Sequence, residues 1–476
     1  MLVEPLARVG GLARTEVHHG NRIDLGGHRF FTRSARVEAW WLARLPVEPG
    51  GAAAGAHPDR VMLRRRRVSR ILFAGRLFRY PIRADAETLR RLGPARVQRI
   101  LRSYLRARLR PRHPERSLED FFVNRFGQEL YTTFFKDYTE KVWGVPCDRL
   151  PAEWGAQRVK GLSIGRALLH AARSRLRPAP AVAAETSLIE WFHYPKLGPG
   201  QLWEAVAEEV AAAGGEVRLG QRAERIELRG GRIARVWVRD LASGALYAVE
   251  APDLVVSTIP LKDLVAACEG EVPAAAREVA AGLQYRDFIT VGLLLPRSAT
   301  AGRLGPVGAM PDNWIYVQEP GVKVGRMQLF HNWSPALVAD PAHAWLGLEY
   351  FCAEGDALWS LPDAELRRFA AAELEQIGIA AAADVLDAVV IRVPKAYPAY
   401  LGDYARLPEL RQFLDGVPNL RVVGRNGMHR YNNQDHSMLA AMVMVDLLLA
   451  GSADREPIWA VNTESEYHEG EAARRG

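Results

Sequence analysis

The segment from Leu420 to Leu449 constrains the fold of this chain more than any other. An apolar run at 420–423 predicts a short buried strand, and Gly424 follows it where the backbone must turn. Polar side chains fill residues 425–437, and the apolar run 438–449 then predicts a helix. Helix N-termini attract anions because their first backbone N–H groups have no partner within the helix. The segment therefore predicts a ligand site at a strand-to-helix junction.

The composition indicates a globular protein of two or three domains. Its 476 residues are 48% hydrophobic, which is enough to bury a large core. Cys147, Cys268 and Cys352 lie far apart, so the sequence implies neither a disulfide framework nor a zinc site, and no metal ligands are predicted. We expect a reducing, cytoplasmic location. Charged residues interrupt 1–17 and the apolar run 438–450 is short, so neither a signal peptide nor an integral membrane segment is expected.

The net charge of +8 comes mostly from arginine, in tracts such as 64–67 and 99–112. We interpret these tracts as solvated faces of helices and strands rather than as a nucleic-acid interface, and expect no nucleic-acid partner. An excess of arginine also suits a small polyanionic substrate such as a sugar nucleotide, because guanidinium groups pair with phosphate in two-pronged contacts.

Two further motifs resemble those of a known family. Residues 138–144, Tyr-Thr-Glu-Lys-Val-Trp-Gly, resemble the Tyr-Thr-x-Lys-x-Trp segment of UDP-galactopyranose mutases. Residues 26–32 resemble the Gly-x-His-x-Phe-His-Thr loop of that family, with Phe31 in place of its second histidine. Together with residues 420–449, these motifs make the chain similar to the mutases and to their relatives among FAD-dependent amine-oxidase and protoporphyrinogen-oxidase-like proteins. Each motif alone also fits a structural role, 138–144 as a helix end with core aromatics and His28 as a structural histidine.

The resemblance implies an α/β fold built on a Rossmann-like FAD-binding domain, with an inserted helical domain and an antiparallel β substrate domain. Residues 62–67 and 71–80 flank Ala74 and Gly75 and predict a β-hairpin, and helical spacing at 97–109 and 118–135 marks the insertion. The predicted divisions are FAD-binding parts at 1–45, 186–262 and 415–452, a β-hairpin and loop at 46–84, a helical domain at 85–185, a β substrate domain at 263–414, and a flexible C-terminal tail at 453–476.

The first strand of that FAD-binding domain is missing from the sequence. Leu2-Val3-Glu4 resembles the second strand, whereas the family's first strand, its Gly-x-Gly-x-x-Gly turn and its first helix would occupy roughly 30 residues before Glu4. The first strand is central in a doubly wound sheet, so its loss would leave a gap between its neighbours. Either the start is assigned too late, which we favour because nothing downstream is eroded, or the chain is a truncated relative.

The resemblance also implies which residues bind FAD. The acidic residue after the second strand would bind the ribose, and glycines would let the backbone approach phosphate and the flavin ring. The implied cofactor-binding residues are Glu4, Gly10, Gly11, Arg14, Gly26, Gly27, Ala223, Gly424, Asn433, Asp435 and Ser437.

The same resemblance implies a substrate site. Arg326 and Arg425 would clamp a diphosphate from opposite sides, and His28 would lie against the flavin, so these three are the predicted catalytic residues. The predicted substrate-binding residues are Thr139, Trp143, Arg158, Tyr194, Tyr397 and Tyr431. Residues 192–200 depart from the family's uracil-binding loops, which puts uridine recognition in question.

Three functions follow as alternatives. The first is a redox-neutral sugar-nucleotide mutase, in which reduced FAD attacks the anomeric carbon through N5 and an external reductant keeps the flavin reduced. The second is a net-redox FAD oxidoreductase of the amine oxidase, protoporphyrinogen oxidase or desaturase type. The third is a flavin-free binding relative. We favour the first because oxidation of an amine or an apolar substrate would not need the arginines and tyrosines; a homodimeric state is left open.

Overall fold

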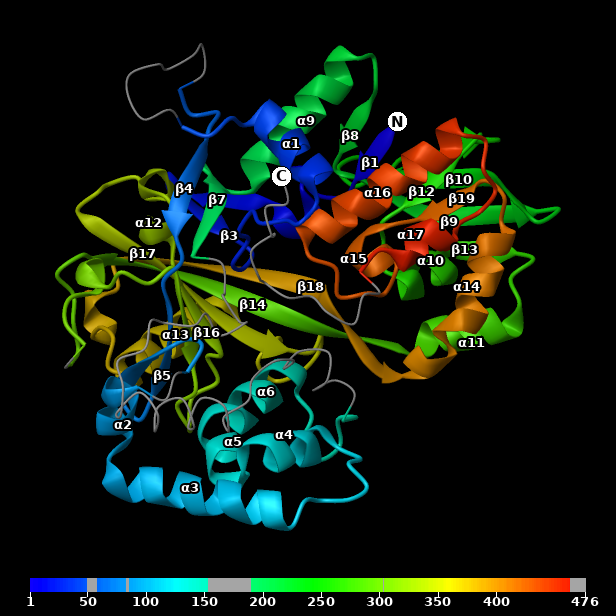
Figure 1. Ribbon diagram of the computed structural model, residues 1–476. Helices are drawn as coiled ribbons and strands as arrows, with labels where there is room; N and C mark the ends of the chain where they lie inside the picture. The colour runs from blue at the N-terminus through cyan, green and yellow to red at the C-terminus, as the bar shows by residue number, and fades with distance from the viewer. Residues whose placement is uncertain (49–57, 83–84, 153–189, 303, 463–476) are drawn as a thin grey trace, which may run out of the picture.

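The computed structural model describes residues 1–48, 58–82, 85–152, 190–302 and 304–462, and its largest sheet has seven strands (Figure 1). These strands lie in the order β18-β14-β17-β16-β15-β5-β6. All neighbours are antiparallel except β15 and β5, which run parallel. The strands are β5 (Ser69–Phe73), β6 (Arg76–Arg79), β14 (Leu283–Pro296), β15 (Trp314–Val317), β16 (Arg326–Leu329), β17 (His343–Cys352) and β18 (Asp387–Gly402).

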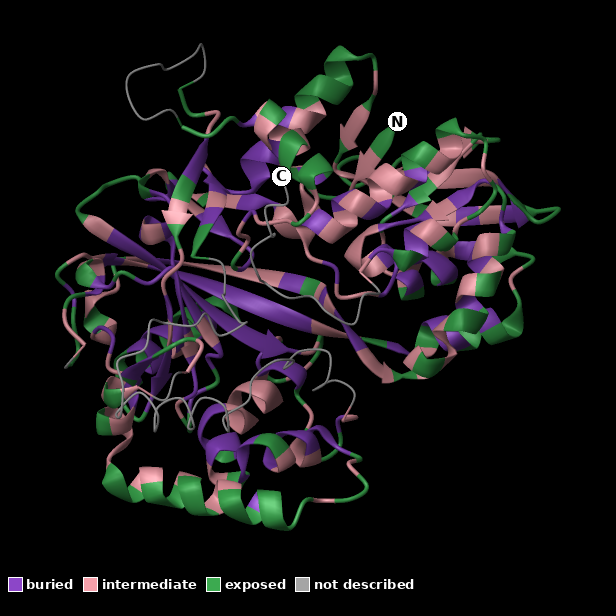
Figure 2. Ribbon diagram, viewed as in Figure 1, coloured by how far each residue is buried: buried purple, intermediate pink, exposed green. Residues whose placement is uncertain are grey.

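The centre of this sheet is buried on both faces. Figure 2 shows β14 and β17 buried over most of their length, which explains their nearly continuous apolar sequences. Helix α13 (Asp363–Gln376) packs Leu366 and Leu374 into the main apolar cluster of the sheet. A second cluster around Trp333 and Trp345 joins the sheet to Ile23 of the N-terminal hairpin. The hairpin and the sheet thus share one core.

The predicted FAD-binding half contains two separate pairs of parallel strands. Strand β1 (Leu2–Glu4) pairs with β8 (Val217–Leu219), and β12 (Val255–Ser257) pairs with β19 (Leu420–Val422). Within the described ranges, no strand joins the two pairs into one sheet. A four-stranded sheet beside them has the order β11-β10-β9-β13 and comprises β9 (Gln221–Arg229), β10 (Arg232–Asp240), β11 (Leu246–Glu250) and β13 (Cys268–Gly270).

Helices cover these strands on the outside (Figure 1). The core of this half contains residues from α10, α11, α14, α16 and α17. The helices of this half are α1 (Ala35–Arg44), α9 (Gly200–Ala212), α10 (Leu261–Ala267), α11 (Ala274–Gly282), α14 (Leu407–Gly416), α15 (Gly424–Gly427), α16 (Gln434–Leu449) and α17 (Glu456–Ala460). The short helix α12 (Phe330–Trp333) instead packs beside β17 of the large sheet.

The helical domain forms the opposite end of the molecule (Figure 1). Ser117 starts its helix α4 with a reciprocal capping box, because its hydroxyl accepts from the Asp120 N–H and the Asp120 carboxylate accepts from the Ser117 N–H. Gly127 turns the chain at a φ of 77°, and any Cβ there would lie 2.6 Å from the Tyr104 nitrogen of α3. The helices are α2 (Ala86–Leu92), α3 (Pro94–Leu109), α4 (Leu118–Phe126), α5 (Gln128–Phe134) and α6 (Lys136–Trp143). The rest of the predicted 85–185 domain, residues 153–185, lies outside the described residues.

Three details differ from the sequence-based expectations. The hairpin around Ala74 and Gly75 is formed by β5 and β6, whereas β4 (Met62–Arg66) pairs with β7 (Trp191–Pro195). Within the predicted 263–414, the strands of the seven-stranded sheet lie at 283–402, because α11 and α14 pack their apolar faces into the core of the FAD-binding half; β5 and β6 of the same sheet come from 69–79. The predicted tail at 453–476 is wrong at its start, because Trp459 of α17 is 3% exposed in that core.

None of the helices in the described ranges has the length and apolar character needed to cross a membrane. Cys147, Cys268 and Cys352 are all buried free thiols. The remaining strands, β2 (Thr15–His18) and β3 (Asn21–Asp24), form the N-terminal hairpin.

Candidate functional site

The first part of the site is a buried ion pair between adjacent strands. Arg326 of β16 is directly opposite Glu349 of β17, and its Nε donates to the Glu349 Oε2 at 2.5 Å. The Glu349 carboxylate is fully buried and also accepts from Gln328 Nε2 at 2.9 Å. Because two neighbours bind the carboxylate, Glu349 fixes the Arg326 guanidinium. Glu349 was not predicted, although one acid within the apolar run 343–352 was a signal that could have identified it.

Arg425, the second predicted arginine, comes from the turn after β19. Gly424 begins this turn at a φ of 83°, a conformation that glycine adopts without strain. The Arg425 Nε donates to the Asn432 carbonyl at 2.8 Å, and its Nη1 donates to the Ala396 carbonyl at 3.0 Å. Among the residues that the structure describes, no carboxylate forms an ion pair with Arg425. The hydrogen bonds of this half-buried cation therefore go to backbone carbonyl groups and not to a counterion.

The two arginines meet at Tyr397 of β18. Arg326 Nη2 donates to the Tyr397 hydroxyl at 3.4 Å, and the Arg425 guanidinium carbon lies 5.5 Å from the Tyr397 ring centroid. The Tyr397 and Tyr431 rings stack at 5.6 Å with an interplanar angle of 14°, and Arg425 lies 5.1 Å from the Tyr431 ring. The fold thus brings four predicted site residues together, here called the arginine–tyrosine cluster: Arg326, Arg425, Tyr397 and Tyr431.

Three more tyrosines extend this cluster. Tyr138 of α6 lies 5.3 Å from Tyr316 of β15, and Tyr316 lies 4.7 Å from Tyr80, between ring centroids. Burial and the neighbouring tyrosines raise the pKa of Tyr138, and the positive charge of Arg326 opposes that rise only in part. The Tyr138 phenol is therefore neutral. None of the three was predicted, although Tyr138 is the first residue of the 138–144 motif.

The loop carrying His28 packs against the same two strands. A Cβ on Gly26 would lie 3.7 Å from both Arg326 Nη2 and Glu349 Oε1, and one on Gly27 would lie 3.2 Å from Gln328 Nε2. Burial, and then the positive charges of Arg425 and Arg326, lower the pKa of His28 to about 3. His28 is therefore a neutral imidazole at physiological pH.

A second group of predicted residues lies at the N-terminus of α16. Asn433 precedes the helix and its backbone N–H donates to His436 Nδ1 at 3.2 Å, while the Ser437 hydroxyl donates to the Asn433 carbonyl at 3.1 Å. Asp435 is buried, and the Thr32 side chain hydrogen-bonds to it. Burial raises the pKa of Asp435. The loop 26–32 therefore meets the start of α16.

Several buried polar atoms around this junction have no hydrogen-bond partner among the described residues. His28 Nδ1, Ser257 Oγ, Asn426 Oδ1 and Gln434 Nε2 are all buried with no hydrogen-bond partner among the described residues. Buried polar groups rarely remain unpaired, so these atoms favour a polar ligand between the 26–32 loop, the end of β12 and the start of α16. The residues at this junction therefore fit a flavin.

A third group lies at the end of β1. The Glu4 carboxylate accepts from the Leu6 N–H at 3.0 Å, and burial raises its pKa. Gly10 and Gly11 have φ values of 104° and 52°, and Arg14 donates to the Gly11 carbonyl at 3.0 Å. Glu4 and Arg14 are close enough for the arginine to lower the Glu4 pKa in part. Both glycines have the positive φ that glycine adopts without strain, so the backbone turns after β1.

The other predicted residues lie apart from these groups. Tyr194 is fully buried and its hydroxyl donates to Asp24, so it belongs to the core. Trp143 is 5% exposed in the apolar cluster of the helical domain, and Thr139 is half-buried on α6. Ala223 lies on β9, paired with Val238. Arg158 lies outside the described residues.

Comparison with solved structures supports the fold. The reduced UDP-galactopyranose mutase is 20% identical, with a TM-score of 0.74 over 98% of this chain and 93% of that one. A protein assigned as a protoporphyrinogen oxidase from an Exiguobacterium species is 17% identical, with a TM-score of 0.62 over 94% and 92% of the two chains. Putrescine oxidase bound to putrescine is 14% identical, with a TM-score of 0.53 over 93% of each chain. These similarities show a shared fold.

Sequence comparison shows the family. No individual curated sequence matches the chain. The profile of the family described as flavin containing amine oxidoreductase matches residues 1–432. This match extends from β1 to Asn432, so it includes the arginine–tyrosine cluster and the turn before α16. The chain therefore belongs to the flavin-containing amine oxidoreductase family, whose cofactor is FAD.

Proposed function

We propose that this chain is a FAD-dependent enzyme that binds a sugar nucleotide through its diphosphate and interconverts the pyranose and furanose forms of the sugar. The observation that carries the proposal is the meeting of Arg326 and Arg425 at Tyr397, with a carboxylate beside only one of them. The excess positive charge of this site would be balanced by an anionic ligand, and a diphosphate would supply two negative charges or more that both arginines could contact.

The charges explain why the ligand would be an anion. Glu349 neutralises Arg326, whereas Arg425 makes its hydrogen bonds to two carbonyl groups and keeps its net charge. A half-buried cation without a counterion is costly, so an anion next to Arg425 would be stabilised. The hydroxyls of Tyr397 and Tyr431 would donate to the same phosphate oxygens.

Aromatic residues beside the cluster suit the nucleoside. Tyr80 and Tyr316 form a tilted pair, and the Arg67 guanidinium carbon lies 5.8 Å from the Tyr80 ring centroid. Tyr80 is 39% exposed, so a base could stack on it. Residues 192–200, which depart from the family's uracil-binding loops, contribute Phe192 to a buried core cluster, so a base would need another wall such as this one.

The same geometry disfavours oxidation of an amine. A cationic substrate would approach Tyr397 and Tyr431 against the positive charge of Arg425, whose guanidinium carbon lies 5.5 Å and 5.1 Å from the two ring centroids. The two rings also stack on each other at 5.6 Å, which leaves no space for a group between them. Net oxidation of an amine is therefore the alternative function.

The residues near the predicted flavin would orient it. Bound FAD would supply the redox-active nucleophile for this reaction. His28 is neutral, so its imidazole would offer a hydrogen bond without a charge, and Gly26 and Gly27 would allow the ring to approach the backbone. Asp435 and Ser437 would direct polar groups at it from the N-terminus of α16.

A binding measurement tests the diphosphate proposal. The full chain, loaded with FAD, would be titrated with UDP-galactose, with UDP and with unphosphorylated galactose, while the flavin absorbance is followed. Arg425→Met should weaken the binding of both nucleotides by about 30-fold or more, because a charge-assisted pair contributes roughly 2–3 kcal/mol.

Arg421→Met is the matched control. Arg421 lies on β19, just before the turn that carries Arg425, and its guanidinium also donates to two backbone carbonyl groups. It should leave the affinity within about threefold of the wild type. Equal affinity for galactose and UDP-galactose, or an unchanged affinity in Arg425→Met, would contradict the proposal. A chain that binds no FAD would favour the flavin-free alternative instead.

A further inference from the structure

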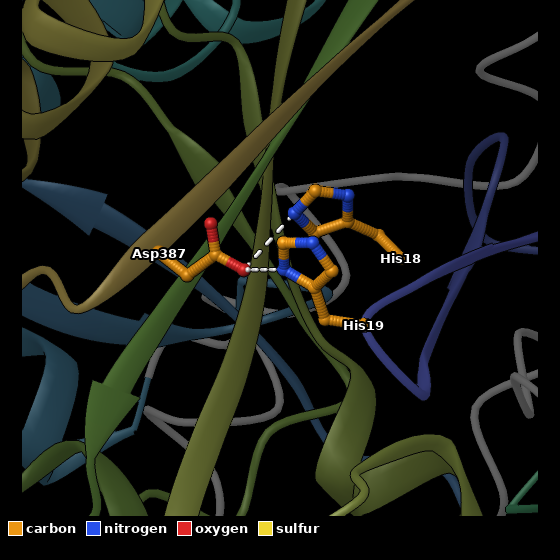
Figure 3. Close-up of side chains that lie close together, drawn as sticks. All are labelled: His18, His19 and Asp387. Carbon is orange, nitrogen blue, oxygen red and sulfur yellow. Dashed lines mark hydrogen bonds and ion pairs between the residues drawn. The ribbon is translucent and has the colours of Figure 1, made fainter.

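A cluster of three metal-ligand side chains lies where the N-terminal hairpin meets the large sheet. His18 ends β2, His19 follows it in the turn, and Asp387 begins β18 (Figure 3). Asp387 Oδ2 lies 3.0 Å from His18 Nε2 and 2.8 Å from His19 Nδ1. The three ligand atoms all lie within 4.8 Å of one another.

The turn conformation brings the two histidines to one side. Consecutive side chains of a strand point to opposite faces. His19, however, has a φ of 47°, and Gly20 follows at a φ of 82°, so the chain reverses direction between β2 and β3. The two imidazole rings therefore face the same carboxylate, with centroids 4.1 Å apart.

The hydrogen bonds within the cluster leave one nitrogen unsatisfied. His19 Nδ1 is hydrogen-bonded to Asp387 Oδ2, and the other carboxylate oxygen accepts from the Ala388 N–H at 2.8 Å. His18 Nε2 is buried and close to Oδ2, but it has no hydrogen bond of acceptable geometry among the described residues. One carboxylate oxygen thus faces two imidazole nitrogens.

A metal ion would satisfy all three groups at once. Two imidazole nitrogens and one carboxylate oxygen form a donor set that suits zinc and neighbouring divalent transition metals. Adjacent ligands of such an ion are roughly 3.0–3.4 Å apart when each bond is about 2.1 Å long. The observed separations of 3.0 and 2.8 Å need to open by only a few tenths of an ångström.

We propose that His18, His19 and Asp387 bind one divalent transition-metal ion, with zinc as the reference ion and water completing its coordination. The side chain of His19 is 75% exposed, so an ion can enter from solvent. Histidine and aspartate ligands are contributed by segments 368 residues apart, which the sequence alone does not bring together.

The position of the site indicates a structural role. Tyr397 lies ten residues farther along β18, about 30 Å away at about 3.3 Å per residue, so the site is separate from the arginine–tyrosine cluster. A bound ion would fasten the β2–β3 hairpin to the first residue of β18. The same hairpin ends at Asp24, two residues before the glycine loop that carries His28.

Metal content and thermal stability test this proposal. The full chain would be treated with chelator, equilibrated with micromolar ZnCl2 and passed through a desalting column before its zinc content is measured. We expect about one zinc per chain, and a rise of the melting temperature of about 2–3 °C at a hundredfold excess over the dissociation constant. MgCl2, which prefers oxygen ligands, should have no effect.

Variants separate this site from adventitious binding. His18→Ala and Asp387→Asn should each abolish the stoichiometric zinc and the zinc-dependent shift. His113→Ala, which removes an exposed histidine of the helical domain, should keep both. Zinc retained in His18→Ala, or no zinc bound by the wild type, would overturn the proposal and leave the cluster as an ion pair. Circular dichroism of each variant distinguishes loss of the site from loss of folding.

Discussion

Replacing Asp24 tests how the buried network under the glycine loop controls stability. Asp24 is 1% exposed; its carboxylate accepts from the Thr15 hydroxyl at 2.9 Å and from the Tyr194 hydroxyl. Burial raises its pKa from 3.8 to about 7, and these hydrogen bonds offset only part of that rise. A difference of about three pH units in pKa corresponds to about 4 kcal/mol, at about 1.4 kcal/mol for each unit.

The direction of the effect follows from proton binding. Between about pH 4 and pH 7 the folded state keeps the Asp24 proton, whereas the unfolded state has lost it. The folded state therefore binds more protons in this window, and the free energy of unfolding falls as the pH rises through it. Asp24→Asn cannot ionise, so the free energy of unfolding of this variant should not decrease between pH 4 and pH 7 for this reason.

The amide also loses one hydrogen-bond acceptor, at a cost of about 1 kcal/mol at every pH. Asp24→Asn should therefore be less stable than the wild type by about 1 kcal/mol at pH 4, and more stable by about 3 kcal/mol at pH 8.

Urea unfolding followed by tryptophan fluorescence at pH 4, 6 and 8 measures this difference. Asp253→Asn, which changes an exposed carboxylate, is the control and should show the same small difference at each pH. If the difference between Asp24→Asn and the wild type were the same at pH 4 and pH 8, the reasoning about burial would be refuted.

Two further predictions concern packing at and beside the site. Arg326→Met leaves the Glu349 carboxylate fully buried without a cation, so it should lower the free energy of unfolding by about 3–5 kcal/mol. Adding Glu349→Gln should restore most of this stability. Urea unfolding at pH 7 measures both variants, and a loss of less than about 1 kcal/mol in Arg326→Met would contradict the burial argument. Gly198→Ala should destabilise the protein by at least about 2 kcal/mol more than Gly305→Ala. Both glycines have positive φ, but only a Cβ at 198 would lie 2.3 Å from Thr15 Oγ1. Equal melting temperatures of the two variants would contradict this steric argument.

Local signals in the sequence predicted the parts of the site that depend on turns. Gly424 between an apolar strand and a polar segment marked the turn that presents Arg425, and the Ala74-Gly75 turn marked the β5–β6 hairpin. In these places a few adjacent residues determine the backbone, so the pattern and the structure agree.

Residues whose environment depends on strand pairing were harder to predict. Tyr194 was expected to bind substrate, but the pairing of β4 with β7 places it in the core, where it contacts Asp24. Tyr316 was not expected in the site, and it meets Tyr138 only because β15 lies under the helical domain. The tail at 453–476 was expected to be flexible, yet Trp459 anchors its first helix in a core made mostly by other segments.

The central claim is that the cluster of Arg326, Arg425, Tyr397 and Tyr431 serves a redox-neutral reaction on a sugar nucleotide. Its most direct test is to incubate the full chain with FAD, dithionite and UDP-galactose under anaerobic conditions, and to separate the pyranose and furanose forms by chromatography. We predict interconversion that needs reduced flavin but consumes no reductant during turnover, and that is lost in Arg425→Met. No interconversion by a flavin-loaded chain, together with flavin reduction by an amine in the absence of dithionite, would contradict the claim.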